Sequence, residues 1–151
     1  TWNPDSGIPF DDSAKQEIFN ELSKDYISGI TFSGGDPLHE NNLNEVLKLV
    51  QEISISFPEK TIWLYTGFEW GELTRYDSYD GFISLESYLR KDVYELYTKR
   101  HQIIKLCNVV VDGEYIDEKK DLTLKWRGSN NQHVIDVQKS LAQNKVILYC
   151  N

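Results

Sequence analysis

The chain has 151 residues, of which 40% are hydrophobic and 26% charged, a composition typical of a folded globular domain. Its formal net charge of −8 at pH 7 disfavours nucleic acid as a partner, because an acidic surface repels a phosphate backbone. No apolar run approaches the roughly 20 residues that a membrane-spanning helix requires, so no membrane partner is expected.

The first half of the sequence alternates between helical and strand patterns. Apolar residues at helical spacing predict a helix over 13–24, and a short strand comes next and ends near Ser33. Asn41 or Asn42 is expected to cap a second helix. The β-branched and aromatic residues of 61–66 predict the next strand.

The second half continues the alternation with a longer irregular stretch inside it. The expected elements are a loop with one helical turn over 68–84, a helix over 85–97, an apolar strand over 104–112, a helix over 134–141 preceded by a capping-box pair at Ser129 and Gln132, and a strand over 145–149.

Alternating helices and strands predict an α/β fold with a parallel sheet and crossover helices. We expect a single domain over residues 1–151, since the sequence contains no linker, low-complexity tract or internal repeat. An open sheet, a partial barrel and a full barrel all fit this order, although four strands are too few for the eight-stranded barrel. Ligands of parallel sheets bind at the carboxyl ends of the strands.

The stretch Ser33-Gly34-Gly35-Asp36 lies at such an end and is followed by Pro37. Two adjacent glycines leave the main chain open to a ligand, and exposed carbonyls beside a carboxylate suit a cationic amino group. The stretch matches neither G-x-x-x-x-G-K-[ST] nor G-x-G-x-x-G, which disfavours the usual phosphate-binding loops. A simple turn between a strand and a helix remains the structural alternative.

The other candidate residues show weaker patterns. His39, His101 and His133 have no metal-ligand spacing and are expected to be surface or capping residues. Cys107 is expected to be a small buried hydrophobe, and with Cys150 it forms neither a zinc motif nor a disulfide framework, which is consistent with a reducing compartment.

Two further combinations have open interpretations. Asp36 and Asp112 both come after predicted strands and would suit an acid and base pair above the sheet. Arg127, between Trp126 and Gly128, is either a group that binds a carboxylate or a partner, or a surface charge beside a tryptophan that anchors the core.

The segments SGGDPL, IWLYTGF, VVVDGEYI and LKWRGSNNQ occur in this order along the chain. Together they resemble the activating proteins of anaerobic ribonucleoside-triphosphate reductase, a family of radical S-adenosylmethionine enzymes that activate glycyl-radical enzymes. The resemblance covers nearly the whole chain and is weakest across residues 69–100. SGGDPL alone is shared with other activases, whereas the four segments in series are more specific.

The resemblance implies a partial (βα) barrel of the radical S-adenosylmethionine type, with its first strand and cluster loop upstream of Thr1. It implies a [4Fe-4S] cluster held by a CxxxCxxC motif, which this sequence lacks, so the metal ligands are expected upstream. Ser33, Gly34, Gly35 and Asp36 match the S-adenosylmethionine-binding motif of the family. Gly34, Gly35 and Asp36 would hold the methionine amino group by hydrogen bonds. Many relatives carry Glu where this chain has Asp36, so the Gly35 main chain is expected to contribute most.

The implied activity is reductive cleavage of S-adenosylmethionine, followed by removal of a hydrogen from a glycine of the reductase. The implied partners are the large catalytic subunit of the reductase and an electron donor such as flavodoxin, in the cytoplasm. Two alternatives remain: an activase of another glycyl-radical enzyme, such as pyruvate formate-lyase, and a non-catalytic α/β domain that binds a small ligand.

Overall fold

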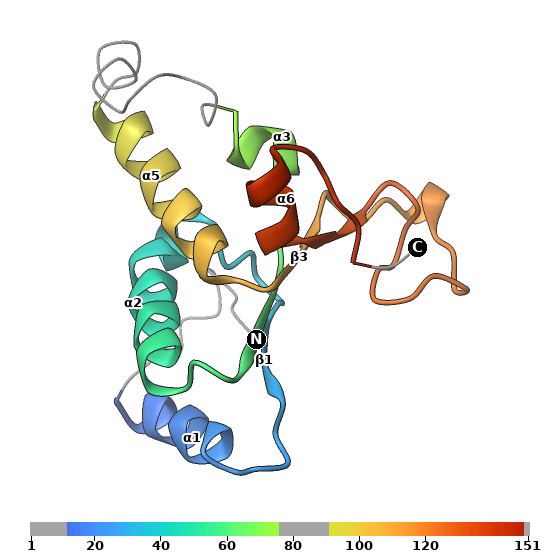
Figure 1. Cartoon of the computed structure of the whole chain (residues 1–151). Helices are drawn as coiled ribbons and strands as arrows, with labels where there is room; N and C mark the ends of the chain where they lie inside the picture. The colour runs from blue at the N-terminus through green and yellow to red at the C-terminus, as the bar shows by residue number, and fades with distance from the viewer. Residues whose placement is uncertain (1–11, 76–90, 150–151) are drawn as a thin grey trace.

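The computed structural model describes residues 12–75 and 91–149 of the chain (Figure 1). A four-stranded sheet forms its centre. The strands lie in the order β1 (Gly29–Phe32), β2 (Thr61–Tyr65), β3 (Val109–Asp112) and β4 (His133–Asp136). β1, β2 and β3 are mutually parallel, and β4 pairs antiparallel with β3. The structure therefore confirms an α/β fold with a mostly parallel sheet.

Helices pack against one face of this sheet. They are α1 (Asp12–Leu22), α2 (Glu40–Ser56), α3 (Trp70–Leu73), α5 (Lys91–Leu106) and α6 (Val137–Gln143). A 3-10 turn, η1 (Asp117–Lys119), lies between β3 and β4 in the chain. α2 and α5 lie side by side along the sheet, as Figure 1 shows. Within residues 12–75 and 91–149, no helix has the length and apolarity needed to cross a bilayer.

The strand residues alternate between two hydrophobic clusters, as expected when successive side chains point to opposite faces. Ile62 and Leu64 of β2 are buried in the main cluster with α2 and α5. Trp63 and Tyr65 are partly buried on the opposite face, where they pack against a smaller cluster of valines from β3 and β4. The helix-covered face is thus the main core, and the other face carries aromatic side chains.

The first half of the chain agrees closely with the sequence-based expectation. α1, β1 and β2 match the predicted elements to within one or two residues. The start of α2 differs, because His39 is its N-cap and accepts a hydrogen bond from the Asn41 main-chain nitrogen at 3.1 Å. Neither Asn41 nor Asn42 caps this helix, since both lie inside it.

The strand predicted over 104–112 is wrong in its first part. α5 continues to Leu106, and Ile103, Ile104 and Cys107 are fully buried at its end. A continuous apolar run does not distinguish a buried helix end from a buried strand. α5 begins at Lys91 in the described residues, and the predicted helix residues 85–90 lie outside them.

The elements predicted after β3 are also corrected. Val134 lies in the antiparallel strand β4 rather than in a helix, and α6 begins at Val137 with the Asp136 side chain accepting from the Lys139 nitrogen. No crossover helix joins β3 to β4, so the chain returns antiparallel. The predicted strand 145–149 is reduced to one bridge, between Leu148 and Ile135.

Gly29 makes a close contact that tests the β1–β2 register. A Cβ atom at Gly29 would lie 2.0 Å from the main-chain oxygen of Thr61, its pairing partner in β2. We expect Gly29→Ala to lower the free energy of unfolding by about 1–3 kcal/mol, as overpacking against a backbone atom usually does. Urea denaturation of the two proteins measures this difference.

Gly71 provides the matched control, because a Cβ atom there meets no atom within 4 Å. Gly71→Ala lies in helix α3 and should leave stability unchanged or raise it slightly. Equal unfolding midpoints for the two alanine variants would contradict the described register.

Candidate site at the strand ends

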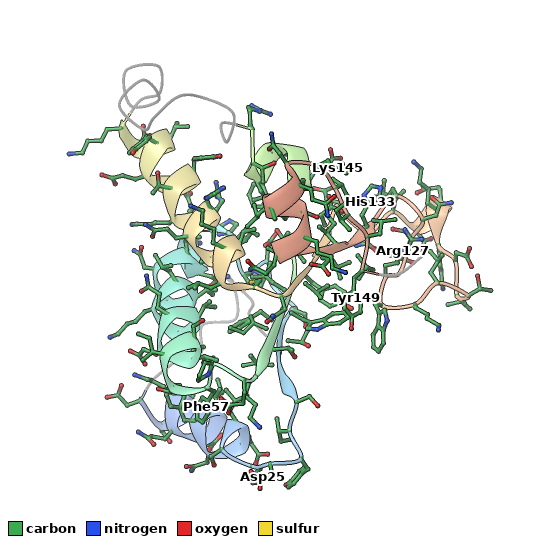
Figure 2. All side chains as sticks on the ribbon, viewed as in Figure 1. Asp25, Phe57, Arg127, His133, Lys145 and Tyr149 are labelled. Atoms are coloured by element: carbon green, nitrogen blue, oxygen red, sulfur yellow. The ribbon has the colours of Figure 1, made fainter. Side chains whose placement is uncertain are left out.

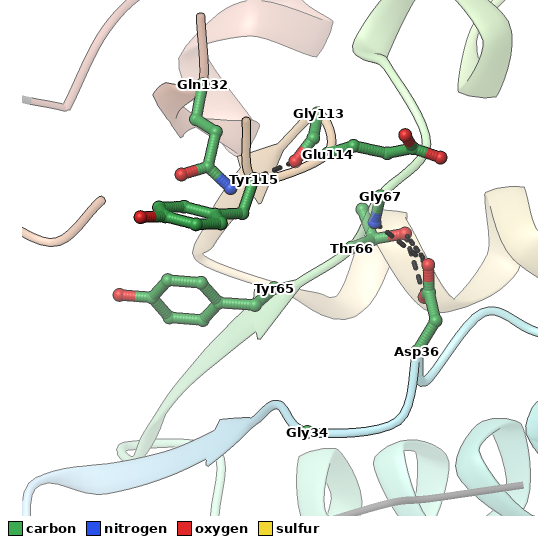
Figure 3. A pocket seen from close by; sticks show the side chains of 9 residues that line it. All are labelled: Gly34, Asp36, Tyr65, Thr66, Gly67, Gly113, Glu114, Tyr115 and Gln132. Carbon is green, nitrogen blue, oxygen red and sulfur yellow. Dashed lines mark hydrogen bonds between the residues drawn. The ribbon is translucent and has the colours of Figure 1, made fainter. Parts of the chain in front are cut away.

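Four chain segments meet at the edge of the sheet where β1, β2 and β3 end. They line an open cavity of about 330 Å³ (Figure 3). Its lining residues are Gly34 and Asp36 after β1, Tyr65, Thr66 and Gly67 at the end of β2, Gly113, Glu114 and Tyr115 after β3, and Gln132 before β4. The cavity occupies the place where parallel sheets bind ligands.

The Asp36 carboxylate joins the ends of β1 and β2. Its Oδ1 accepts from the Leu38 nitrogen at 2.9 Å, and its Oδ2 accepts from the Gly67 nitrogen at 2.9 Å. The Thr66 hydroxyl donates to the same carboxylate, 2.9 Å from Oδ1 and 3.1 Å from Oδ2. Figure 3 shows these bonds to Thr66 and Gly67 beneath the cavity. Both carboxylate oxygens are therefore occupied by groups of the protein itself.

The main chain of Asp36 is also engaged. Its carbonyl accepts from the His39 nitrogen at 3.1 Å and from the Asn42 side-chain amide at 3.0 Å. Asp36 thus leads directly into the start of α2 with its own main-chain acceptor satisfied. Asp36 holds the shape of the loop rather than presenting a free carboxylate at its rim.

The first glycine of the motif has a conformation that other residues rarely adopt. Gly34 has φ of +89°, in the left-handed region that favours glycine. The cavity lining includes Gly34 but not the next residue, Gly35, which is half-buried. Ser33 comes directly after β1 and is also half-buried. The bend therefore presents main-chain atoms, without a side chain, to the cavity.

The Asp112 carboxylate likewise connects the end of β3 to other segments by hydrogen bonds. This residue is 4% exposed, and its carboxylate accepts from the Trp70 nitrogen at 2.8 Å, which fixes the start of α3. Its other oxygen lies 3.0 Å from the His133 nitrogen and 3.1 Å from His133 Nδ1. Asp36 and Asp112 both hold backbone N–H groups, so the geometry does not favour them as a free acid and base pair.

Arg100 of α5 supports the loop from the helix side, a contact that the sequence analysis missed. Its Nε donates to the Leu38 carbonyl at 2.9 Å, and its guanidinium lies 4.4 Å from the centre of the Phe68 ring. Burial lowers the pKa of Arg100, while the nearby carboxylate of Asp36 opposes this shift. Arg100 thus braces the two loops that Asp36 joins.

Trp126 and Arg127 lie on the face of the sheet away from α2 and α5. Trp126 has φ of 68° and is 55% exposed, so it is not the core anchor considered above. Its ring packs edge to face on Trp63, 5.3 Å between centroids. The guanidinium of Arg127 donates a hydrogen bond to the Gln132 carbonyl, so this side chain contacts the protein itself. Figure 2 shows Arg127 and Tyr149 on this side.

Within the described residues, no group of three His, Cys, Asp or Glu side chains is placed to hold a metal ion. Cys107 is fully buried as expected, and burial raises the pKa of its thiol to about 12. His39 caps a helix and His133 is exposed, as expected, but His101 is buried on α5 and stacks on Tyr97. Cys150 lies outside the described residues.

The bond between Asp36 and Thr66 can be isolated with a double-mutant cycle. Asp36→Asn places an amide donor against the Gly67 N–H or the Thr66 hydroxyl, and Thr66→Val removes that hydroxyl. We expect each change to lower the free energy of unfolding by about 1–3 kcal/mol, since it leaves polar groups unsatisfied.

The two effects should be less than additive, with a coupling of about 0.5–3 kcal/mol, because the side chains contact each other directly. Urea denaturation of the four proteins gives this value. Strict additivity would show that the bond contributes nothing to holding the strand ends together.

Several known proteins are similar to this chain over most of its length. The family model described as a 4Fe-4S single cluster domain matches residues 1–135. An anaerobic ribonucleoside-triphosphate reductase-activating protein of Escherichia coli K12 is 38% identical over 136 residues, which cover 89% of this chain and 73% of that protein. A protein of the same name from Enterobacteria phage T4 is 34% identical, and the match covers 89% of this chain and 69% of that protein. One from Haemophilus influenzae is 33% identical, and the match covers 87% of this chain and 72% of that protein.

No solved structure gives a significant match. The sequence matches nevertheless include the glycine bend, the three strand ends and the residues before β4 that line the cavity. On this similarity, across most of both its own length and that of its relatives, the chain belongs to the family of anaerobic ribonucleoside-triphosphate reductase-activating proteins.

Proposed function

We propose that the cavity at the strand ends binds S-adenosylmethionine, and that the protein uses it to generate a glycyl radical on anaerobic ribonucleoside-triphosphate reductase. The observation that carries the proposal is the side-chain-free bend at Gly34, which opens into a cavity of about 330 Å³. Relatives named as activating proteins of this reductase support the choice of partner.

The residues at the cavity fit the amino-acid end of such a ligand. Main-chain carbonyls of residues 33–35 would accept hydrogen bonds from its cationic amino group, which carries donors only. Asp36 would act by holding this segment against Thr66 and Gly67, since its own carboxylate is occupied. Gly67 has no side chain, and Glu114 and Asp36 lie close beside it.

Bound S-adenosylmethionine would supply a 5′-deoxyadenosyl radical when one electron enters its sulfonium, a carbon–sulfur bond breaks and methionine is released, and this radical would take a hydrogen atom from the partner's glycine to give 5′-deoxyadenosine. The residues of this chain bind and orient the ligand. The parallel strands β1 to β3 would then be part of a partial (βα) barrel, with residues 1–151 as one domain. An electron donor such as flavodoxin and a cytoplasmic location would suit this chemistry.

The iron-sulfur cluster does not fit the described residues. Clusters of this type are held by cysteine thiolates, and the chain has two cysteines, of which Cys107 is fully buried with a raised pKa. No residue within 12–75 and 91–149 is therefore assigned as a ligand of the cluster.

Two other functions, a non-catalytic ligand-binding domain and an activase of another glycyl-radical enzyme, can be distinguished from the proposed one. A non-catalytic α/β domain would bind its ligand without the upstream cysteines, and reading the codons before Thr1 distinguishes it. An activase of another glycyl-radical enzyme is disfavoured by the relatives, which carry the name of the ribonucleotide reductase activator.

A substitution at the bend tests the proposal. Gly34→Ala adds a methyl group at a residue with φ of +89°, which strains the loop and places an atom at the cavity wall. We expect the complete, cluster-containing protein to lose at least about tenfold in affinity for S-adenosylmethionine, equivalent to roughly 1.4 kcal/mol. Calorimetric titration measures the affinity.

Gly71→Ala is the control, because it adds the same methyl group away from the cavity in open space. Circular dichroism of both variants establishes that each is folded. Unchanged affinity in a folded Gly34→Ala protein would refute the binding of S-adenosylmethionine at this bend.

A further inference from the structure

The cavity over the strand ends is lined by two carboxylates and by no Lys, Arg or His side chain of the described residues. The Asp36 carboxylate accepts hydrogen bonds at both oxygens from the main chain and from Thr66. Glu114, shortly after β3, provides the second carboxylate. Figure 3 shows its side chain extending past Gly67, on the side of the view where Asp36 lies.

Glu114 differs from Asp36 in what its carboxylate contacts. Its main-chain carbonyl accepts from the Asn131 side-chain amide at 2.8 Å. Its carboxylate makes no hydrogen bond or ion pair within the part of the chain that the structure describes, and the residue is exposed. The carboxylate is therefore held at the cavity by its main chain but is open to a ligand.

Gly67 allows the two acidic side chains to approach the same point. A Cβ atom at Gly67 would lie 3.3 Å from Cγ of Glu114 and 3.4 Å from Oδ2 of Asp36. The stem of the Glu114 side chain and the Asp36 carboxylate therefore both lie beside Gly67. The lining thus carries two acidic side chains and, among the described residues, no basic one.

We infer that Glu114 is the counter-charge for the cationic α-amino group of the ligand, and so determines specificity for an amino-acid end at this site. This inference rests on the proposed function. An ammonium group has three N–H donors and can bind main-chain carbonyls and a carboxylate at once. A sulfonium has no hydrogen to donate, so an exposed carboxylate stabilises it less in water.

Two ligands and one conservative substitution test this role. S-adenosylmethionine carries the ammonium and the sulfonium, whereas S-adenosylhomocysteine carries the ammonium alone. Both are titrated calorimetrically into the complete protein with its cluster oxidised, so that no ligand is cleaved. Glu114→Gln keeps the shape of the side chain and should weaken both ligands by about tenfold, as loss of a charge-assisted hydrogen bond does.

Glu118→Gln is the matched control, because it removes an exposed carboxylate of η1 that does not line the cavity. Both affinities should stay unchanged in that variant. Unchanged affinities in Glu114→Gln would overturn the inference. A loss for S-adenosylmethionine alone would also overturn it, since the contact would then be with the sulfonium.

Failure of this inference can be separated from failure of the proposed function. If Gly34→Ala weakens binding of S-adenosylmethionine and Glu114→Gln does not, the binding site is supported and only the role of Glu114 is refuted. If the unsubstituted protein binds neither ligand, the proposed function falls and the role of Glu114 falls with it.

Discussion

The hydrogen bonds of the Asp36 carboxylate are the constraint on which the site depends. They hold the loop after β1 against Thr66 and Gly67 after β2 at about 2.9 Å, although these segments are far apart in sequence. Asp112 does the same between β3, the start of α3 and the start of β4. Buried or half-buried carboxylates that accept several N–H groups make a rigid edge from loops that would otherwise move. The cavity is the space that this rigid edge leaves open.

The division of roles between the two cavity carboxylates is a consequence of this geometry. The Asp36 carboxylate accepts from Leu38, Thr66 and Gly67, so it shapes the bend. Glu114 has no such partners in the described residues and provides the charge. Arg100 braces the same loop through the Leu38 carbonyl without entering the cavity lining. The site thus separates the residues that build it from the residues that meet the ligand.

The sequence predicted the parts of this arrangement that depend on local patterns. Two glycines after an apolar strand indicated an exposed main chain, and Gly34 does line the cavity with φ of +89°. The contacts of Arg100 and Glu114 were not predictable, because they join segments whose spatial proximity depends on the tertiary fold. Asp36 was expected at the rim, but its donors lie much later in the chain, in Thr66 and Gly67, where no local pattern reveals them.

The errors in secondary structure have equally specific causes. Residues 104–106 belong to a largely apolar run that continues into β3, so helix and strand could not be distinguished there. Ser129 and Gln132 do form the hydrogen bond of a capping pair, since Gln132 Oε1 accepts from the Ser129 nitrogen at 3.2 Å. Strand pairing with β3 nevertheless outweighs helix formation after them. Local capping signals indicate a bend in the chain, but tertiary pairing decides whether a helix or a strand comes next.

A crystal structure of the complete, cluster-loaded protein with S-adenosylmethionine tests the central claim most directly. The account predicts that the methionine amino group lies about 3 Å from main-chain carbonyl oxygens of the Ser33–Asp36 bend, with Asp36 still bonded to Thr66 and Gly67. A ligand bound elsewhere, with the bend occupied by protein side chains, would contradict the account.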